Sequence, residues 1–277
     1  MADDALPLRE HRGYVGAMTT APAVDPATGL RTDGGPDLDH LALLAALQEA
    51  FAAGTRTADP AARVPACGRW RVRNLVEHLG RIHHWAAGQA RRERETPLGR
   101  GPFDLVPFYT AQAAELHGTL VALGPDADAW TLTGRGPATF WWRRQLHETL
   151  VHLHDLRAAG HGSGVAVGAQ DPVGVDAEVW ADGVDEVVTM FQPRQVRLDR
   201  MAPLDRTVAL HATDVGRVWM LGAHDDTEPG VPATTVHAPA RELDLLLWRR
   251  LSPEEAGATV TGDPDALDAA LAEPIVP

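Results

Sequence analysis

Residues 139–159 read TFWWRRQLHETLVHLHDLRAA, and this stretch decides how the chain folds. Its apolar side chains recur at helical spacing and form one stripe: Leu146, Leu150 and Leu153. Roughly the opposite side of the helix carries one tryptophan and four polar residues: Trp141, Arg144, Glu148, His152 and Asp155. The pattern predicts an amphipathic helix that stops at Gly160.

Two residues of this helix have the spacing of a metal half-site. Glu148 and His152 are four residues apart, so their side chains lie one above the other on the same face. A carboxylate and an imidazole placed in this way suit a divalent ion. His147 lies five residues before His152, about 140° around the helix, so these two histidines are not expected to share an ion. A third ligand must come from another helix, and His78 is the candidate.

The same residues have a simpler interpretation, which periodicity alone leaves open. An amphipathic helix ordinarily presents a solvated polar face, and His78 beside an apolar stripe is more often a hydrogen-bonded core residue than a ligand. Asp155 either orients a ligand or pairs with an arginine at the surface. His83 and His84 are expected at a helix surface.

The rest of the chain predicts an α+β protein in three parts. Residues 1–36 lack periodicity and are expected to be a mobile extension, residues 37–192 a bundle of four or five helices, and residues 193–277 a small α/β domain. The bundle helices are expected at 37–53 with Asp37 as N-cap, from 72 to 88, and at 103–123, 139–159 and 171–190. The C-terminal part predicts strands at 207–214, 216–223 and 233–240, helices at 241–251 and 264–272, and a strand or turn at 259–263.

Composition removes several classes of function. The net charge of −13 disfavours nucleic acid and anionic membranes as partners. The sequence contains no lysine and only two serines, which excludes a Walker-type phosphate loop and a Schiff base and disfavours a serine nucleophile. The single cysteine, Cys67, excludes an internal disulfide and a cysteine-rich zinc site. Without an apolar run of membrane-spanning length or a signal peptide, the chain is expected to be cytoplasmic.

Several segments, in their order and spacing, resemble one enzyme family. The pattern W-x-V-x-x-L-V-x-H-L-G spans residues 70–80, and R-x-x-H-E-T-x-x-H-x-x-D spans 144–155. Later segments are ADGVDE at 181–186, LLLWRR at 245–250 and VTGD at 260–263. Together they resemble the mycothiol-dependent maleylpyruvate isomerase family, part of the wider group of DinB-like metal-binding helical bundles.

The resemblance implies a fold, a metal and a cosubstrate. The expected fold is a DinB-like bundle followed by a small sterol-carrier-like α/β domain. His78, Glu148 and His152 match the metal ligands, with zinc as the expected ion and nickel as the alternative. The resemblance also implies that a small thiol, mycothiol, binds the metal through its sulfur, where a dication lowers the pKa of the thiol. The expected activity is that of an isomerase or S-transferase acting on a small electrophile.

Two further residues and two competing functions complete the hypothesis. Arg250 matches the arginine of the family's tryptophan-containing segment and is the expected clamp for a substrate carboxylate, with Arg249 as a weaker candidate and a surface salt bridge as the alternative. The chain departs from the family at His154, where an aromatic residue is usual. The competing functions are a metalloenzyme of the same fold that uses no thiol, and a non-catalytic module that binds a small molecule.

Overall fold

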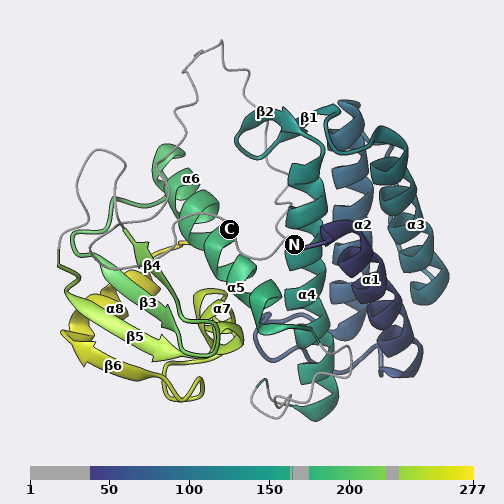
Figure 1. Ribbon diagram of the computed structural model, residues 1–277. Coiled ribbons are helices and arrows are strands. Elements are labelled where there is room, and N and C mark those ends of the chain that lie inside the picture. The colour runs from purple at the N-terminus through teal and green to yellow at the C-terminus, as the bar shows by residue number, and fades with distance from the viewer. Residues whose placement is uncertain (1–37, 163, 165–174, 223–230) are drawn as a thin grey trace. The chain divides into compact units, whose positions relative to one another are not determined.

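Four long helices form a bundle in the N-terminal half of the chain (Figure 1). The computed structural model describes residues 38–162, 164, 175–222 and 231–277, all within one compact unit. The bundle helices are α1 (His40–Thr57), α2 (Val72–Arg91), α3 (Leu105–Leu123) and α4 (Thr139–His161). Helix α1 packs against α3 and α4, and α2 packs against the same two helices. The expected bundle is therefore present.

Local capping explains where these helices begin and end. The N-cap of α1 is Asp39, whose carboxylate accepts a hydrogen bond from the backbone N–H of Ala42 at 2.9 Å. The expected cap, Asp37, lies outside the described residues. Helix α4 continues through Gly160, where we expected it to stop, and ends at Gly162, whose left-handed conformation favours glycine.

The bundle core consists of fully buried leucines and aromatic residues. The largest of these side chains are Trp141, Tyr109, Phe51, Leu75, Leu79, Leu146 and Leu150. Gly80 lets α2 and α3 approach closely, because a Cβ at this position would lie 2.6 Å from the ring of Phe108. Two residues before it stands His78, so this close contact fixes the part of α2 that carries a candidate ligand.

The fifth helix is shorter than expected and belongs by packing to the C-terminal elements. Helix α5 spans Ala177–Glu186 and is followed by a π-helical turn, Val187–Phe191, and by α6 (Gln192–Arg197). The predicted start at residue 171 lies outside the described residues. Helix α5 packs against α7 (Ala240–Leu247).

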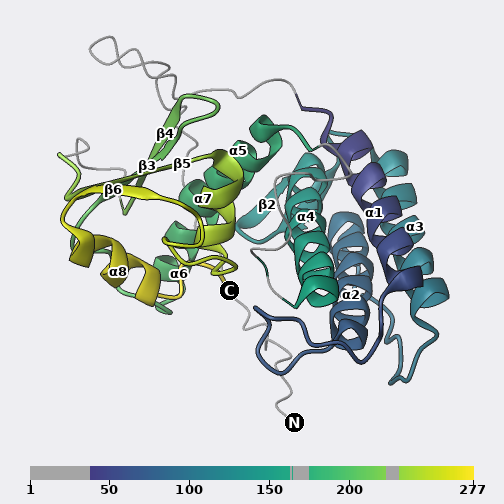
Figure 2. The same ribbon diagram turned by 90° about the horizontal axis from the view of Figure 1, so that it is seen from below.

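A four-stranded sheet forms the C-terminal part, as Figure 2 shows. Its strands are β3 (Val208–Ala212), β4 (Arg217–Leu221), β5 (Thr234–Ala238) and β6 (Thr259–Gly262), in the order β4-β3-β5-β6. Strands β3 and β5 are parallel, whereas the two outer pairs are antiparallel. Helix α8 (Pro264–Ala272) packs against β3 and β5. The predicted strands and helices are thus confirmed, and the chain has the α+β fold.

One hairpin was absent from the expectations. Strands β1 (Asp128–Thr131) and β2 (Gly134–Pro137) pair just before α4. The indole N–H of Trp141 donates to the carbonyl of Trp130 at 2.7 Å and ties this hairpin to the first turn of α4. Among the described helices, none has the length and apolar character that a membrane span requires.

Asp182 on α5 joins three helices. Its Oδ2 atom lies 2.7 Å from Nε2 of His147 on α4 and 3.1 Å from Nε2 of His40 on α1. The guanidinium of Arg143 on α4 also donates to this carboxylate, at 3.0 Å. Burial alone would raise the pKa of Asp182, but His147, His40 and Arg143 hold it well below its usual value. The carboxylate therefore stabilises the fold in its ionised form.

We expect Asp182→Asn to lower the free energy of unfolding by about 2–4 kcal/mol at pH 7, because it leaves buried donors without their charged partner. The folded-state pKa lies below the ordinary value, so this contribution is complete above about pH 4 and is lost as the pH falls further. The difference between variant and parent, measured by urea unfolding, should shrink below pH 4. Asp268→Asn, at an exposed position on α8, is the control and should change stability by less than about 0.5 kcal/mol.

Candidate metal centre

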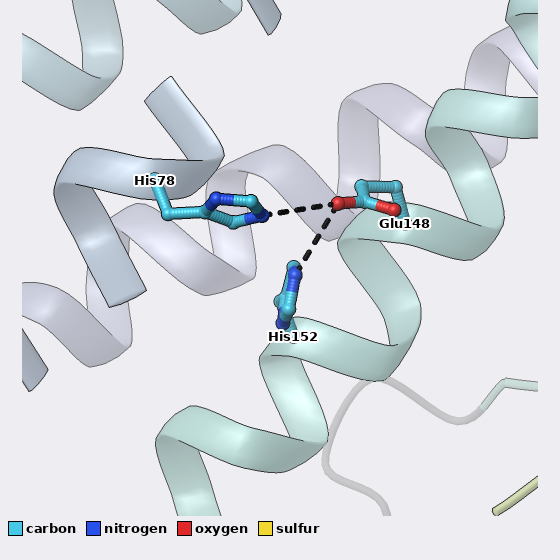
Figure 3. Close-up of side chains that lie close together, drawn as sticks. All are labelled: His78, Glu148 and His152. Atoms are coloured by element: carbon cyan, nitrogen blue, oxygen red, sulfur yellow. Dashed lines mark ion pairs between the residues drawn. The ribbon is translucent and has the colours of Figure 1, made fainter. Parts of the chain in front are cut away.

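Three side chains from two bundle helices converge at one point (Figure 3). His78 comes from α2, whereas Glu148 and His152 come from successive turns of α4. Oε1 of Glu148 lies 3.5 Å from Nε2 of His78 and 3.3 Å from Nε2 of His152. One candidate ligand atom from each of the three residues lies within 4.8 Å of the others. The structure thus brings together the three residues that the sequence singled out.

The spacing and the donor types fit a divalent ion. In a tetrahedral zinc site with bonds of about 2.1 Å, neighbouring ligand atoms lie about 3.4 Å apart. Both distances from Glu148 to the imidazoles are close to that value. Two imidazole nitrogens and one carboxylate oxygen suit zinc and related ions, and three protein ligands leave a coordination position for another molecule.

The polar side of α4 is buried, so a solvated face does not explain it. The exposed fraction is 3% for Arg144, 8% for His152 and 0% for Asp155. Helix α2 covers part of this side, and residues that follow in the chain, such as Glu186 and Arg250, cover more of it. Charges placed there need partners within the protein, because water does not reach them.

Arg144 holds one oxygen of Glu148. Its guanidinium forms ion pairs with Oε2 of Glu148, one turn later on α4, and with Glu186 at the end of α5. The rings of Phe191 and Trp248 lie 4.9 and 5.5 Å from its central carbon. With Oε2 engaged by Arg144, Oε1 is the oxygen that faces both histidines. Arg144 therefore sets the orientation of the carboxylate.

The electrostatics of the cluster favour a positive charge between its carboxylates. Burial would raise the pKa of Glu148, but Arg144 and the two histidines hold it well below its usual value. Burial would lower the pKa of His152, yet its contacts with Asp155 and Glu148 raise it to about 9. The ring of His152, which lies between Glu148 and Asp155, is therefore stabilised in its positively charged form.

Asp155 orients His152 from behind. Its Oδ2 atom lies 2.9 Å from Nδ1 of His152, which leaves Nε2 directed toward Glu148. Arg250 binds the same carboxylate through two donors, with Nε 3.0 Å from Oδ1 and Nη2 2.7 Å from Oδ2. Of the two kinds of contact considered for Asp155, the structure contains both: one with His152 and one with an arginine, and the arginine pair is buried instead of exposed.

The guanidinium of Arg250, which we expected to hold a substrate carboxylate, has three protein partners. Besides Asp155, Nη1 donates to the carbonyl of Trp248 at 2.7 Å, and Nη2 lies 3.8 Å from Sγ of Cys67. The weaker candidate, Arg249, is exposed and donates to the carbonyl of Glu273.

The Cys67 thiol lies 3.5 Å from Oδ2 of Asp155. Burial, together with that carboxylate, raises the pKa of the Cys67 thiol to about 12.

The neighbouring histidines show why sequence periodicity missed part of the site. His83 and His84, expected at a surface, are buried because α2 packs against both α3 and α4. Nδ1 of His83 contacts Oε1 of Gln145 at 2.8 Å, and burial lowers the pKa of His83 to about 4. His84 contacts Glu115 and the carbonyl of Thr96. His147, excluded as a ligand by its helical phase, faces Asp182 as described above.

Sequence reasoning assigned no role to Arg144 or Cys67. Arg144 carried a usable signal, because an arginine four residues before a glutamate forms an i,i+4 pair on one helix face. Cys67 carried none, since it lies in the loop before α2 and meets Asp155 only through tertiary packing.

Fold and cluster together define a class: an α+β protein whose helical bundle carries a candidate two-histidine, one-glutamate metal centre. Comparison with protein families identifies it further. The model described as the mycothiol maleylpyruvate isomerase N-terminal domain matches residues 40–157, and the model of the C-terminal domain of the same family matches residues 178–269. The two matches together span most of the chain. The chain belongs to the mycothiol-dependent maleylpyruvate isomerase family.

Solved structures share the fold. The crystal structure of the mycothiol-dependent maleylpyruvate isomerase matches with a TM-score of 0.55 and 13% identity, over 80% of this chain and 92% of that one. A histidine-to-alanine mutant of that enzyme matches with a TM-score of 0.57 and 12% identity, with the same coverage. A search of curated proteins finds no match.

We expect Arg144→Met to lower the free energy of unfolding by about 3–5 kcal/mol, because it leaves Glu148 and Glu186 buried without their shared counter-charge. Urea denaturation at pH 7 measures the loss. The double variant Arg144→Met with Glu186→Gln should recover part of it, since one uncompensated charge is then removed. A loss below about 1 kcal/mol in the single variant would show that this ion-pair network is unimportant.

Proposed function

We propose that this protein is a metal-dependent enzyme that binds one divalent ion, zinc or alternatively nickel, through His78, Glu148 and His152. We further propose that it uses mycothiol as cosubstrate, as an isomerase or S-transferase acting on a small electrophilic substrate. The observation that carries the proposal is the convergence of the three candidate ligand atoms within 4.8 Å. Family membership and the names of the solved relatives support the thiol and the reaction class.

The donor set determines what chemistry a bound ion would supply. A dication held by three protein ligands offers an open position and lowers the pKa of a thiol that binds there, giving a thiolate at neutral pH. The protein's own thiol near this centre, Cys67, is a poor nucleophile, because burial and Asp155 raise its pKa to about 12.

The protein's own residues orient this centre. Arg144 occupies Oε2 of Glu148 and leaves Oε1 toward the two histidines. Asp155 fixes the ring of His152 through Nδ1, and Arg250 fixes Asp155. In this proposal Arg250 acts through Asp155 and His152, while a direct contact between Arg250 and a substrate carboxylate would require its fork to leave Asp155.

A small electrophile is the substrate class that follows from a thiolate nucleophile. Addition of the thiolate to an activated alkene, rotation about the resulting single bond and loss of the thiol together constitute an isomerisation with no net change in composition. Displacement of a leaving group or opening of a strained ring by the same nucleophile constitutes an S-transfer. Both reactions require the thiol to be deprotonated and the electrophilic carbon of the substrate to reach its sulfur.

We expect purified protein to contain about one zinc or nickel ion per chain, and Glu148→Gln and His152→Ala each to lose it. Inductively coupled plasma mass spectrometry after dialysis against metal-free buffer measures the content. His117→Ala, a partly exposed position on α3 away from the cluster, is the matched histidine control and should retain the ion. Parent protein without stoichiometric metal would refute the metal centre.

Asp155→Asn should weaken metal binding about 10–100-fold while all three ligands remain, because loss of the carboxylate frees the ring of His152. Competition with a fluorescent zinc chelator measures the affinity. Since the same change also disturbs Arg250, Arg250→Gln should be compared; we expect a smaller loss there, as Asp155 keeps its contact with His152. Unchanged affinity in Asp155→Asn would rule out its orienting role.

A further inference from the structure

Two histidines stand side by side on the C-terminal sheet, and the proposed function uses neither of them. His211 on β3 and His237 on β5 are direct partners in the register of these two parallel strands. Their Nδ1 atoms lie 2.9 Å apart, and their rings are inclined at 72° with centroids 5.0 Å apart. Both side chains therefore direct the same nitrogen toward one point between them.

This pair lies on the side of the sheet that the hydrophobic core does not use. Leu210 of β3 and Val236 of β5 are fully buried in the core together with residues of α7 and α8, and α8 packs against these two strands (Figure 2). Successive side chains of a strand point to opposite faces, so the adjacent residues His211 and His237 point the other way. Both are partly exposed, and an ion from solvent can reach them.

Each of the two imidazoles has another imidazole as its partner, whereas other histidines of this protein contact carboxylates. His84, His147 and His152 are examples of the latter. A neutral imidazole has one donor and one acceptor nitrogen, so the contact between His211 and His237 requires one Nδ1 to carry a proton and the other to accept it. A metal ion removes this requirement, because both Nδ1 atoms then bind it through their lone pairs.

The separation of the two nitrogens fits adjacent positions around an ion with right-angled coordination. With metal–nitrogen bonds of about 2.0 Å, ligand atoms at 90° lie about 2.8 Å apart, whereas tetrahedral ligands lie about 3.3–3.4 Å apart. The observed 2.9 Å is closer to the first value. Tetragonal coordination by nitrogen is typical of copper(II) and nickel(II). The pair differs in this respect from the candidate metal centre, where the corresponding distances are 3.3 and 3.5 Å.

Short side chains surround the pair on its face of the sheet. Two residues before His211 stands Ala209, and two residues before His237 stands Thr235. The register partner of His237 on β6 is Thr259. These short neighbours leave the remaining coordination positions to water. Because β3 and β5 are the two central strands, the backbone fixes both imidazoles on rigid elements before an ion binds.

We propose that His211 and His237 together bind one copper(II) ion through their Nδ1 atoms, with water in the remaining positions. Nickel(II) binds the same pair more weakly, since the affinity of a nitrogen site rises from nickel to copper and falls again at zinc. Two imidazoles bind one ion more tightly than either does alone, because attachment of the second is intramolecular. The site belongs to the sheet and shares no residue with the candidate metal centre of the bundle.

Copper(II) binding to the tag-free, full-length protein tests the proposal, after the protein is loaded with zinc and excess zinc is removed. We expect about one copper ion per chain with a roughly micromolar dissociation constant, measured by competition with a chromophoric chelator. The electron paramagnetic resonance spectrum should show coupling to two imidazole nitrogens. His211→Ala and His237→Ala should each weaken binding at least about tenfold, and the double variant should lose no more than either single variant.

Matched variants separate ion binding from a hydrogen bond between the rings. His237→Asn keeps an amide able to hydrogen-bond to His211 but removes the imidazole, so we expect loss of copper with an unchanged Tm in the absence of metal. His117→Ala, at a partly exposed position on α3, should bind copper like the parent. Glu148→Gln, which alters the candidate metal centre, should also keep the copper bound at the sheet.

Three results would overturn the proposal: no copper bound by the zinc-loaded parent, equal copper binding by the parent and His211→Ala, or single variants that each keep about half of a weak binding. The last result is expected of two imidazoles that act independently. Thermal unfolding without metal shows that each variant is folded, and added copper should raise the Tm of the parent more than that of His237→Asn. These measurements need neither thiol nor substrate, so they are independent of the proposed enzyme function.

Discussion

Charge buried along one side of helix α4 is the constraint on which the rest of the structure depends. Arg144, His152 and Asp155 on this side are buried, and the side chain of Glu148 is 16% exposed, so each needs an opposite charge within the protein. The charged residues of α4 do not by themselves neutralise one another. Glu186 at the end of α5 and an arginine just after α7 supply the remainder. The C-terminal elements are therefore part of the electrostatic environment of the bundle.

The spacing of apolar residues predicted most helices and strands, because it is close to 3.6 residues in helices such as α2 and two residues in strands β3 to β5. It did not predict features that depend on tertiary contacts or on capping. In the β1–β2 hairpin, Gly134–Pro137 has no buried side chain, so alternation was absent and the contact between Trp141 and Trp130 holds the hairpin in place. Gly160 has the sequence signature of a helix end, but α4 continues to His161 and is capped by Gly162 in the left-handed conformation.

Parts of the candidate site that lie within one helix could be predicted from the sequence, whereas contacts between distant segments could not. The phase of one helix was sufficient to pair Glu148 with His152 and to exclude His147. Periodicity could not show what covers the polar face, so the face looked solvated although it is buried. His78 required the resemblance to a family, because nothing local relates α2 to α4. The partners of Arg250 depend on folding that brings together residues 95 positions apart, and no sequence pattern encodes that contact.

The distances in the three-residue cluster are longer than those of two neighbouring histidine–carboxylate pairs. Two neighbouring histidine–carboxylate pairs lie at hydrogen-bond distance: 2.7 Å for His147 and Asp182, and 2.9 Å for His152 and Asp155. Around Oε1 of Glu148, the Nε2 atoms of His152 and His78 lie at the longer distances of 3.3 and 3.5 Å. That wider spacing is close to the roughly 3.4 Å expected between neighbouring ligands of a tetrahedral ion, which supports the proposed metal centre, and Glu148 and His152 are contacted on their far sides by Arg144 and Asp155. Contacts that keep these side chains at this separation would suit the proposed ion better than a salt bridge, whose strength would increase if the gap closed.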